Sequence, residues 1–426
     1  MVDFRYNKES SRPTQDKQIK ARASESNGET MSSLLNRNDE MSNTRGDRFV
    51  SLAPKTSRVV EEWKQPCCFK NDFYFVCMAD TQLGMMQALD PKNSFLPLVG
   101  CEDVKDFYKA EKDFSRRAVQ YINGLSPRPA FVVVCGDLVN AYPSQKEKHA
   151  SEVEDYKEIF ARVDPDIKLV CLCGNHDLGE KPSPVEVSNF IANFGADYFY
   201  FWFGGIKFVV LNSQLYKCDE NCKELALQQD AWLDKQLEGV DLDTDQRVCV
   251  FTHIPPFIDT EDEADGYFTL SSKVRNSLLT RLAGHNCTHW FSGHFHRNVA
   301  GLYRDKVTGK YLQCITTAAI GGNIFHTKPG VGQRNELSGM AGITLDDHLS
   351  GMRFVFVEKT EMKHVYLSLR DLQKMSSLDD SGKKLRGGVD ANTEGRELNV
   401  ELIKLRIGDD KTYCDEKRPS KRTKIS

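Results

Sequence analysis

The sequence contains no long hydrophobic run. Its two longest apolar stretches, residues 73–79 and 130–135, are much shorter than the roughly 20 residues that a membrane-spanning helix needs. Residues 1–30 are rich in Lys, Arg, Ser, Glu and Asn and include no apolar segment of the kind that directs secretion. We therefore expect no membrane partner and a cytoplasmic location.

A strong excess of charge of one sign is also missing. The chain has 57 Lys and Arg against 61 Asp and Glu, a formal net charge of −4, which gives no reason to expect nucleic acid as a partner. A basic cluster near the C-terminus fits a nuclear localisation signal, although such a cluster is more often part of a solvated tail. It consists of Lys417, Arg418, Lys421, Arg422 and Lys424.

The cysteines do not form a recognisable disulfide framework. There are 13, an odd number, in a long chain. Cys135, Cys171, Cys173 and Cys249 lie within apolar runs where a strand would bury them. We expect these thiols to be reduced, as is usual in the cytosol.

Aromatic and branched apolar residues are scarce in residues 1–60, so this segment is predicted to be a disordered N-terminal extension. Residues 70–370 carry the pattern of a folded domain. Residues 371–426 are mostly polar and are predicted to form a largely disordered tail. Within it, residues 398–407 alternate apolar and polar side chains imperfectly, which we interpret as an isolated strand or as no regular structure.

Short apolar runs alternate with amphipathic stretches from residue 71 onward, which predicts β-α-β units and an α/β fold. The predicted strands are residues 73–79, 130–135, 168–173, 199–203, 207–211, 247–251, 290–292, 311–316, 352–358 and 364–369. The predicted helices are residues 104–123, 146–163, 226–237 and 271–283.

Five short polar motifs follow apolar runs in this pattern. They are Asp80-Thr81-Gln82, Gly136-Asp137, Gly174-Asn175-His176-Asp177, Thr252-His253 and Gly293-His294-Phe295-His296. Loops at the carboxyl ends of strands converge in open α/β sheets, even when they are far apart in sequence. Together the motifs supply carboxylates, an amide oxygen and imidazoles, the donors that a two-metal centre requires.

Each motif alone has an ordinary structural explanation. Asp80 suits a helix cap or a turn, Gly136-Asp137 a tight turn, and His253 a packed histidine beside a rigid Pro-Pro turn. All five in order at strand ends are difficult to explain in this way.

The motifs resemble the D-x-H, G-D, G-N-H-D/E, H and G-H-x-H signature of the calcineurin-like metallophosphoesterase superfamily, over residues of about 70 to 320. More narrowly, residues 78–84, 135–141, 211–214, 253–257 and 292–298 resemble the calcineurin-like phosphoesterase domain-containing protein 1 family, which is described as cytoplasmic serine/threonine-protein phosphatases. The resemblance implies a four-layer α/β/β/α sandwich of two mixed sheets.

The resemblance also implies two divalent cations, Mn²⁺, Fe²⁺/Fe³⁺ or Zn²⁺. The first would take Asp80, a shared Asp137 and His296, with Gln82 nearby. The second would take Asp137, Asn175, His253 and His294. His176 is then the candidate general acid, with its ring oriented by Asn140 or Asp177, and Asn175 and His176 are candidates for substrate binding.

Two positions depart from the superfamily pattern. Gln82 stands where the first motif usually has histidine, which implies a weaker or differently selective first metal site. The arginines that clamp phosphate in the large serine/threonine phosphatases have no counterpart beside the G-D and G-N-H motifs. Arg297 is the nearest candidate replacement, against the ordinary alternative of a solvated loop arginine.

The resemblance therefore implies a metal-dependent phosphatase in which a metal-bridging hydroxide attacks directly. Phosphoserine or phosphothreonine in a protein is the expected substrate, and we expect a monomer. A small-molecule or nucleotide phosphoesterase with the same metals is the alternative. A non-catalytic binding module is the third possibility, disfavoured because the ligand motifs other than Gln82 are intact.

Overall fold

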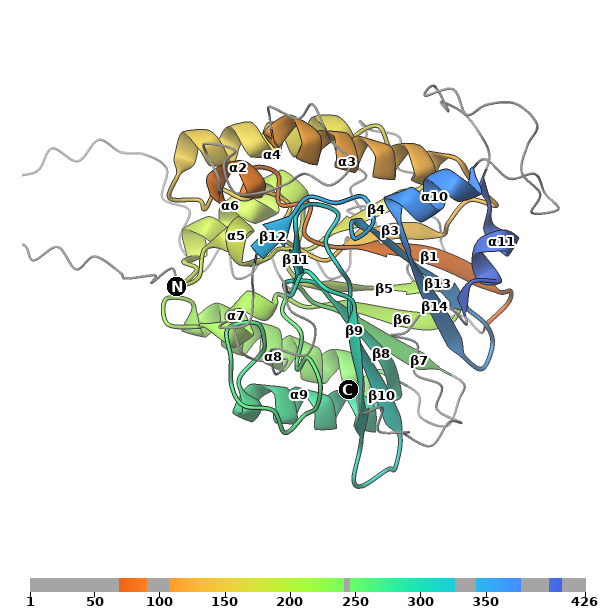
Figure 1. The fold of residues 1–426 in the computed structure, drawn as a ribbon. Coiled ribbons are helices and arrows are strands. Elements are labelled where there is room, and N and C mark those ends of the chain that lie inside the picture. Colours follow the sequence, from red (N-terminus) through yellow and green to blue (C-terminus); the bar gives the residue numbers. More distant parts are fainter. Residues whose placement is uncertain (1–68, 90–106, 241–245, 326–341, 377–397, 408–426) are drawn as a thin grey trace, which may run out of the picture. The chain divides into compact units, whose positions relative to one another are not determined.

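In the computed structural model, two mixed β-sheets lie face to face between layers of helices (Figure 1). The structure describes residues 69–89, 107–240, 246–325, 342–376 and 398–407. All of these belong to one unit, residues 46–426. None of the described helices is long and apolar enough to cross a bilayer.

The first sheet has the strand order β14-β13-β1-β3-β4. Its strands are β1 (Phe73–Met78), β3 (Phe131–Val134), β4 (Lys168–Cys171), β13 (Gly351–Val357) and β14 (Met362–Ser368). β1, β3 and β4 run parallel, whereas β13 and β14 pair antiparallel. The parallel strands are apolar on both faces because both faces are covered.

The second sheet has the order β5-β6-β7-β8-β10-β9. Its strands are β5 (Phe199–Phe203), β6 (Ile206–Val210), β7 (Arg247–Phe251), β8 (Cys287–Ser292), β9 (Val299–Arg304) and β10 (Tyr311–Thr316). The inner strands run parallel, and the edge strands β5 and β9 are antiparallel to their neighbours. Two small sheets add β2 (Leu125–Ser126) with β15 (Leu398–Asn399), and β11 (Asn323–Phe325) with β12 (Gly342–Thr344).

Helices cover the outer faces of both sheets (Figure 1). Over the first sheet lie α2 (Met85–Leu89), α3 (Phe107–Asn123), α4 (Lys146–Phe160), α6 (Pro184–Phe194), α10 (Leu369–Met375) and α11 (Val400–Lys404). α8 (Lys223–Glu238) and α9 (Ser272–Gly284) cover the second sheet. The short helices α5 (Asn175–Leu178) and α7 (Ser213–Lys217) follow β4 and β6.

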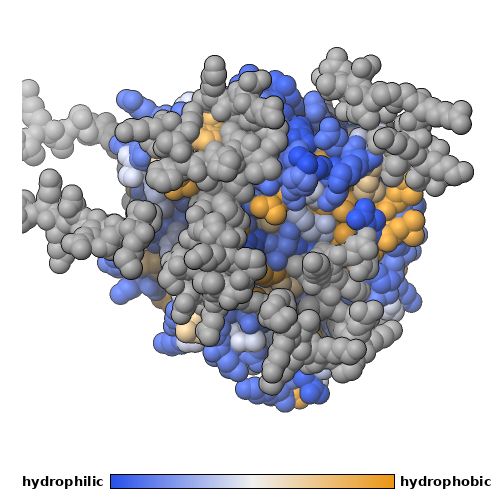
Figure 2. Space-filling model, in the orientation of Figure 1, coloured by the Kyte–Doolittle hydropathy of each residue, from blue (hydrophilic) through white to orange (hydrophobic). Residues whose placement is uncertain are grey.

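The alternation of side chains along each strand divides the core into three layers. In β1, Phe75 and Cys77 point between the sheets, while Tyr74, Val76 and Met78 point to the helices. Phenylalanines fill the layer between the sheets, where each buried ring contributes roughly 1.5–3 kcal/mol. On the face seen in Figure 2 the described surface is mainly hydrophilic, with smaller hydrophobic patches.

This arrangement confirms the predicted α/β/β/α sandwich of two mixed sheets. It differs from the sequence-based prediction beyond residue 370. Leu372, Met375, Leu398, Val400 and Ile403 are buried against the first sheet's helical layer, so residues 371–376 and 398–407 are packed rather than an unstructured tail. Residues 398–407 form a two-residue strand and a helical turn, not an isolated strand. The predicted N-terminal extension and the basic C-terminal cluster lie outside the described residues.

Nine of the cysteines lie in the described part of the chain, and all nine are free thiols. Eight of these side chains are buried, including Cys135, Cys171, Cys173 and Cys249.

Candidate metal centre

The candidate ligands all follow the carboxyl ends of parallel strands. Asp80 comes after β1, Asp137 after β3, Asn175 after β4 and His253 after β7. His294 and His296 both follow β8. The structure brings these six side chains, predicted from separate motifs, into one buried cluster.

The backbone of these loops adopts an unfavourable conformation. Among the described residues, six that are not glycine have positive φ. Four of them belong to the cluster and a fifth, Gln82, follows Asp80 in the same motif: Asp80 (52°), Gln82 (36°), Asp137 (49°), His294 (68°) and His296 (53°). Each such residue costs on the order of 1–3 kcal/mol, and such residues concentrate at functional sites. The concentration here points to a site whose geometry matters more than its local stability.

Two motif glycines leave room for the carboxylates. A Cβ atom on Gly293 would lie 2.6 Å from Oδ2 of Asp80 and 2.7 Å from Cβ of Ala79, and one on Gly174 would clash with the side chain of Asp137. The glycines before His294 and Asn175 are therefore needed for close approach of the loops.

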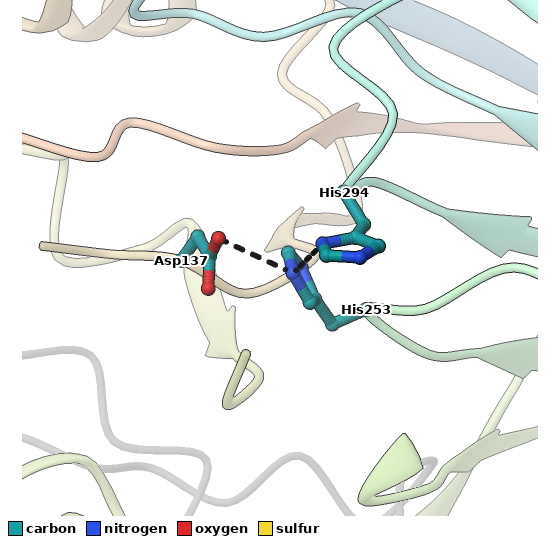
Figure 3. A group of neighbouring side chains, drawn as sticks. All are labelled: Asp137, His253 and His294. Atoms are coloured by element: carbon teal, nitrogen blue, oxygen red, sulfur yellow. Dashed lines mark hydrogen bonds and ion pairs between the residues drawn. The ribbon is translucent and has the colours of Figure 1, made fainter. Parts of the chain in front are cut away.

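One half of the cluster consists of Asp137, Asn175, His253 and His294. Figure 3 shows three of these side chains, Asp137, His253 and His294. Nε2 of His253 lies 3.3 Å from Oδ2 of Asp137, 3.1 Å from Oδ1 of Asn175 and 3.1 Å from Nδ1 of His294. Four potential donors thus face one point. Two imidazoles, a carboxylate and an amide oxygen suit a divalent cation such as Zn²⁺, Mn²⁺ or Fe²⁺.

The other half consists of Asp80, Asp137 and His296, whose donor atoms lie within 4.8 Å of one another. Nε2 of His296 is 3.4 Å from Oδ1 of Asp80. Nε2 of Gln82 donates to Oδ1 of Asn140 at 3.3 Å, and its buried Oε1 has no hydrogen-bond partner within the described residues. A buried carbonyl oxygen without a partner is costly, so this atom fits a ligand of the first cation.

Each of the three histidines uses its other ring nitrogen to contact a backbone carbonyl. Nδ1 of His253 is 2.8 Å from the oxygen of Cys135, and Nδ1 of His296 is 2.6 Å from that of Gly322. Nε2 of His294 is 3.4 Å from the oxygen of Tyr267. A carbonyl only accepts, so it selects the tautomer whose opposite nitrogen is free to bind a cation.

The charged side chains of the cluster shift one another's pKa values. Burial raises the pKa of Asp80 well above its usual value, an effect that His253 partly opposes. Burial also opposes the ionisation of Asp137, but His253 and His176 outweigh it and lower the pKa of that carboxyl. Burial lowers the pKa of His253, yet Asp137 and Asp80 outweigh it and raise this pKa to about 9. The carboxylates therefore stabilise a positive charge in the site, here the protonated ring of His253. A bound metal cation would supply that charge instead, and the histidine would release its proton.

His176 lies beside the cluster without joining either ligand group. Its backbone N–H donates to Oδ1 of Asp137 at 2.9 Å, its Nδ1 contacts the backbone oxygen of Asn140, and its ring stacks on Tyr142 with centroids 4.5 Å apart. Of the two predicted ring partners, Asn140 therefore makes the contact, through its main chain. The carboxylate of Asp177 instead accepts from the backbone N–H of Gly174 at 2.8 Å and that of Leu138.

Arg297 directly follows His296 in the chain. Its Nε donates to the backbone oxygen of Ile324 at 3.0 Å, and its guanidinium lies over the ring of Phe295. Both His296 and Arg297 line a pocket of about 380 Å³. The arginine thus borders the ligand cluster without belonging to it.

The sequence did not reveal Tyr142, Glu180 or Tyr267, which contact His176, Asn175 and His294, respectively. Glu180 accepts hydrogen bonds from both tyrosines and from Asn175. No local pattern marks these residues, because their meeting depends on three loops that are distant in sequence.

The sandwich with paired ligand groups at its strand ends defines a metallophosphoesterase, a metal-dependent hydrolase with a dinuclear centre. The family model for calcineurin-like phosphoesterases matches residues 73–298, and the chain belongs to that family.

Named relatives support a narrower similarity. The chain is 35% identical to the serine/threonine-protein phosphatase CPPED1 of Mus musculus over 339 residues, which covers 80% of this chain and 96% of the mouse protein. It is 35% identical to the Homo sapiens protein of the same name over 334 residues, 78% and 93% of the two chains. A crystal structure of a dimetal phosphatase from Danio rerio is similar with a TM-score of 0.43 and 14% identity, over 70% of this chain and 99% of that one.

Proposed function

We propose that this metal-dependent phosphatase removes phosphate from phosphoserine and phosphothreonine in proteins. The observation that carries its catalytic part is the convergence of two ligand groups on Asp137, with His176 beside them. The protein substrate is supported by the names of the relatives, serine/threonine-protein phosphatases, which this chain matches over most of its length.

The six ligand residues and Gln82 would hold two divalent cations. Such a pair supplies a water activated for direct, in-line attack and neutralises the phosphate oxygens. The mixture of carboxylate, amide and imidazole donors fits Mn²⁺, Fe²⁺/Fe³⁺ or Zn²⁺. Asp137 would be the carboxylate that the two cations share, because it belongs to both groups.

His176 is proposed to protonate the leaving alkoxide of serine or threonine. Its Nδ1 faces the Asn140 carbonyl, which accepts from the protonated ring and leaves the Nε2 proton for transfer. Stacking on Tyr142 fixes the plane of the ring. Because water attacks phosphorus directly, no covalent phosphoenzyme forms and the configuration at phosphorus inverts.

Arg297 is proposed to contact the substrate from the pocket that it shares with His296. Asn175 and His176 are proposed to contact the substrate as well. The monomeric state and cytoplasmic location expected from the sequence belong to the same proposal.

A substrate panel tests the function. Purified protein with Mn²⁺ is assayed on phosphoserine and phosphothreonine peptides, nucleoside monophosphates, a phosphodiester and an aryl phosphate. The proposal predicts the highest kcat/KM for the phosphopeptides. A strong preference for nucleotides or diesters would reject the protein substrate while leaving the metal chemistry intact. Inactivity on every substrate would support a binding module.

A further inference from the structure

Three loops of the site meet at one exposed carboxylate, Glu180, which lies just after α5. Its Oε1 accepts hydrogen bonds from Nδ2 of Asn175 at 2.8 Å, the hydroxyl of Tyr142 at 3.0 Å and the hydroxyl of Tyr267 at 2.9 Å. Tyr142 follows β3, Asn175 begins α5, and Tyr267 lies between β7 and α9. One oxygen thus ties together segments that each bear on the ligand cluster.

The bond to Asn175 determines which way its amide points. The two ends of an amide have almost the same shape but opposite hydrogen-bonding character. Nδ2 of Asn175 faces Glu180 and, at 3.3 Å, the hydroxyl of Tyr267. Oδ1 therefore faces inward, 3.1 Å from Nε2 of His253. Rotating the amide by half a turn would place Nδ2 against the cation and an oxygen against a carboxylate.

The tyrosines extend this effect to both sides of the site. The ring of Tyr142 stacks on His176. The backbone oxygen of Tyr267 contacts Nε2 of His294, and the ring centroids of Tyr267 and His294 lie 5.0 Å apart. Nζ of Lys217 donates to the backbone oxygens of Gly266 and Thr269, which lie on either side of Tyr267 in the chain. Glu180 thereby links the loop after β3 and the segment before α9 to the start of α5.

We propose that Glu180 is a positioning residue for the second metal site. By accepting from Nδ2 of Asn175, it keeps Oδ1 of that amide turned toward the position of the second cation. The inference rests on the proposed function, because it takes Asn175 as a ligand. Glu180 acts through Asn175 and makes no contact with the donor atoms of the other ligands in the described structure. Partners that orient metal ligands in this way typically change metal affinity or activity by about 10–100-fold when they are removed.

The test is calorimetric titration of the full chain, stripped of metal, with Mn²⁺. Glu180→Ala should weaken binding at one of two sites by about 10–100-fold, and Glu180→Gln by less, since its amide retains one acceptor oxygen. Glu158→Ala is the matched control. Glu158 is an exposed carboxylate on α4 that pairs with Arg162 at 2.8 Å, and its loss should leave both affinities unchanged. The activity of Glu180→Ala should return toward that of the wild type at saturating Mn²⁺.

The outcomes separate this inference from the proposed function. Two Mn²⁺ sites in the wild type and unchanged affinities in Glu180→Ala would overturn the role of Glu180 and leave the metal centre standing. A wild type that binds no Mn²⁺ would count against the metal centre itself. If Glu180→Ala does not fold, Glu180→Gln decides, and wild-type affinities in that variant would overturn the inference.

Discussion

Nδ1 of His176 contacts the backbone oxygen of Asn140, so the loop after β3 orients the ring of this histidine. The three histidines of the ligand cluster also contact backbone carbonyls, but His176, unlike them, belongs to neither group of converging donor atoms. His176 is therefore available for proton transfer although it directly follows Asn175, a proposed metal ligand.

His176→Ala should lower kcat by about 10²–10⁴-fold because the leaving alkoxide loses its proton donor. Its metal content should match that of the wild type. The comparison variant is His294→Ala, which removes a ligand and should lose metal and turnover together. Metal analysis alongside the assay distinguishes the two roles. Equal metal loss in both variants would make His176 a ligand instead.

Gln82→His should tighten the first metal site. The present side chain offers only the buried Oε1, whereas imidazole is a stronger donor to Zn²⁺. We expect affinity at this site to rise at least about tenfold, or ~1.4 kcal/mol, and Gln82→Leu to lower it. A Zn²⁺ titration of the three proteins provides the measurement. Identical curves would mean that residue 82 does not face the cation.

Gly293→Ala should disturb the site through steric contact. The added Cβ would meet Asp80 at 2.6 Å, and overpacking of this kind costs roughly 1–3 kcal/mol of the free energy of unfolding. Gly284→Ala is the control, because a Cβ there meets nothing within 4 Å at the end of α9. Urea unfolding should show a loss in the first variant and none in the second. Equal stabilities would show that the β8 loop adapts.

His289 should make the protein less stable as the pH falls. Burial lowers its pKa to about 3, with His364 and Arg247 adding to the effect. Between pH 6.5 and 3 the unfolded chain binds a proton that the folded chain does not. The free energy of unfolding therefore decreases as pH falls through this window, by up to about 1.4 kcal/mol per pH unit.

His289→Gln isolates this contribution, since glutamine does not titrate. Urea unfolding at pH 7 and pH 5 should show a smaller loss of stability in the variant than in the wild type. The same loss in both proteins would mean that His289 is protonated in the folded state or is not the responsible group.

The sequence allowed the sandwich and the ligand residues to be predicted for different reasons. Strands such as β1 and β3 are apolar on both faces, and their polar continuations, Asp80 and Asp137, stand out because they end such runs. The prediction for residues 398–407 was wrong because the segment has too few apolar side chains to show a periodicity. Their burial depends on packing against the helices of the first sheet.

The parts of the site that escaped prediction depend on contacts between loops. The carbonyls of Cys135, Tyr267 and Gly322 that orient the histidines carry no side-chain signal. Glu180 looks like any exposed acid until Tyr142 and Tyr267 are seen to meet it. Local sequence patterns predict the metal ligands, whereas only the tertiary structure shows which residues orient them.

Equilibrium dialysis with metal analysis, applied to the wild type and to Asp137→Asn, gives the number of Mn²⁺ ions bound per chain and decides whether the two ligand groups form one dinuclear centre. Asp137 belongs to both ligand groups, so we expect two ions in the wild type and weakened binding at both sites in the variant, with loss of turnover. A wild type that binds one ion or none, or a variant that binds two as tightly as the wild type, would contradict a shared two-metal centre.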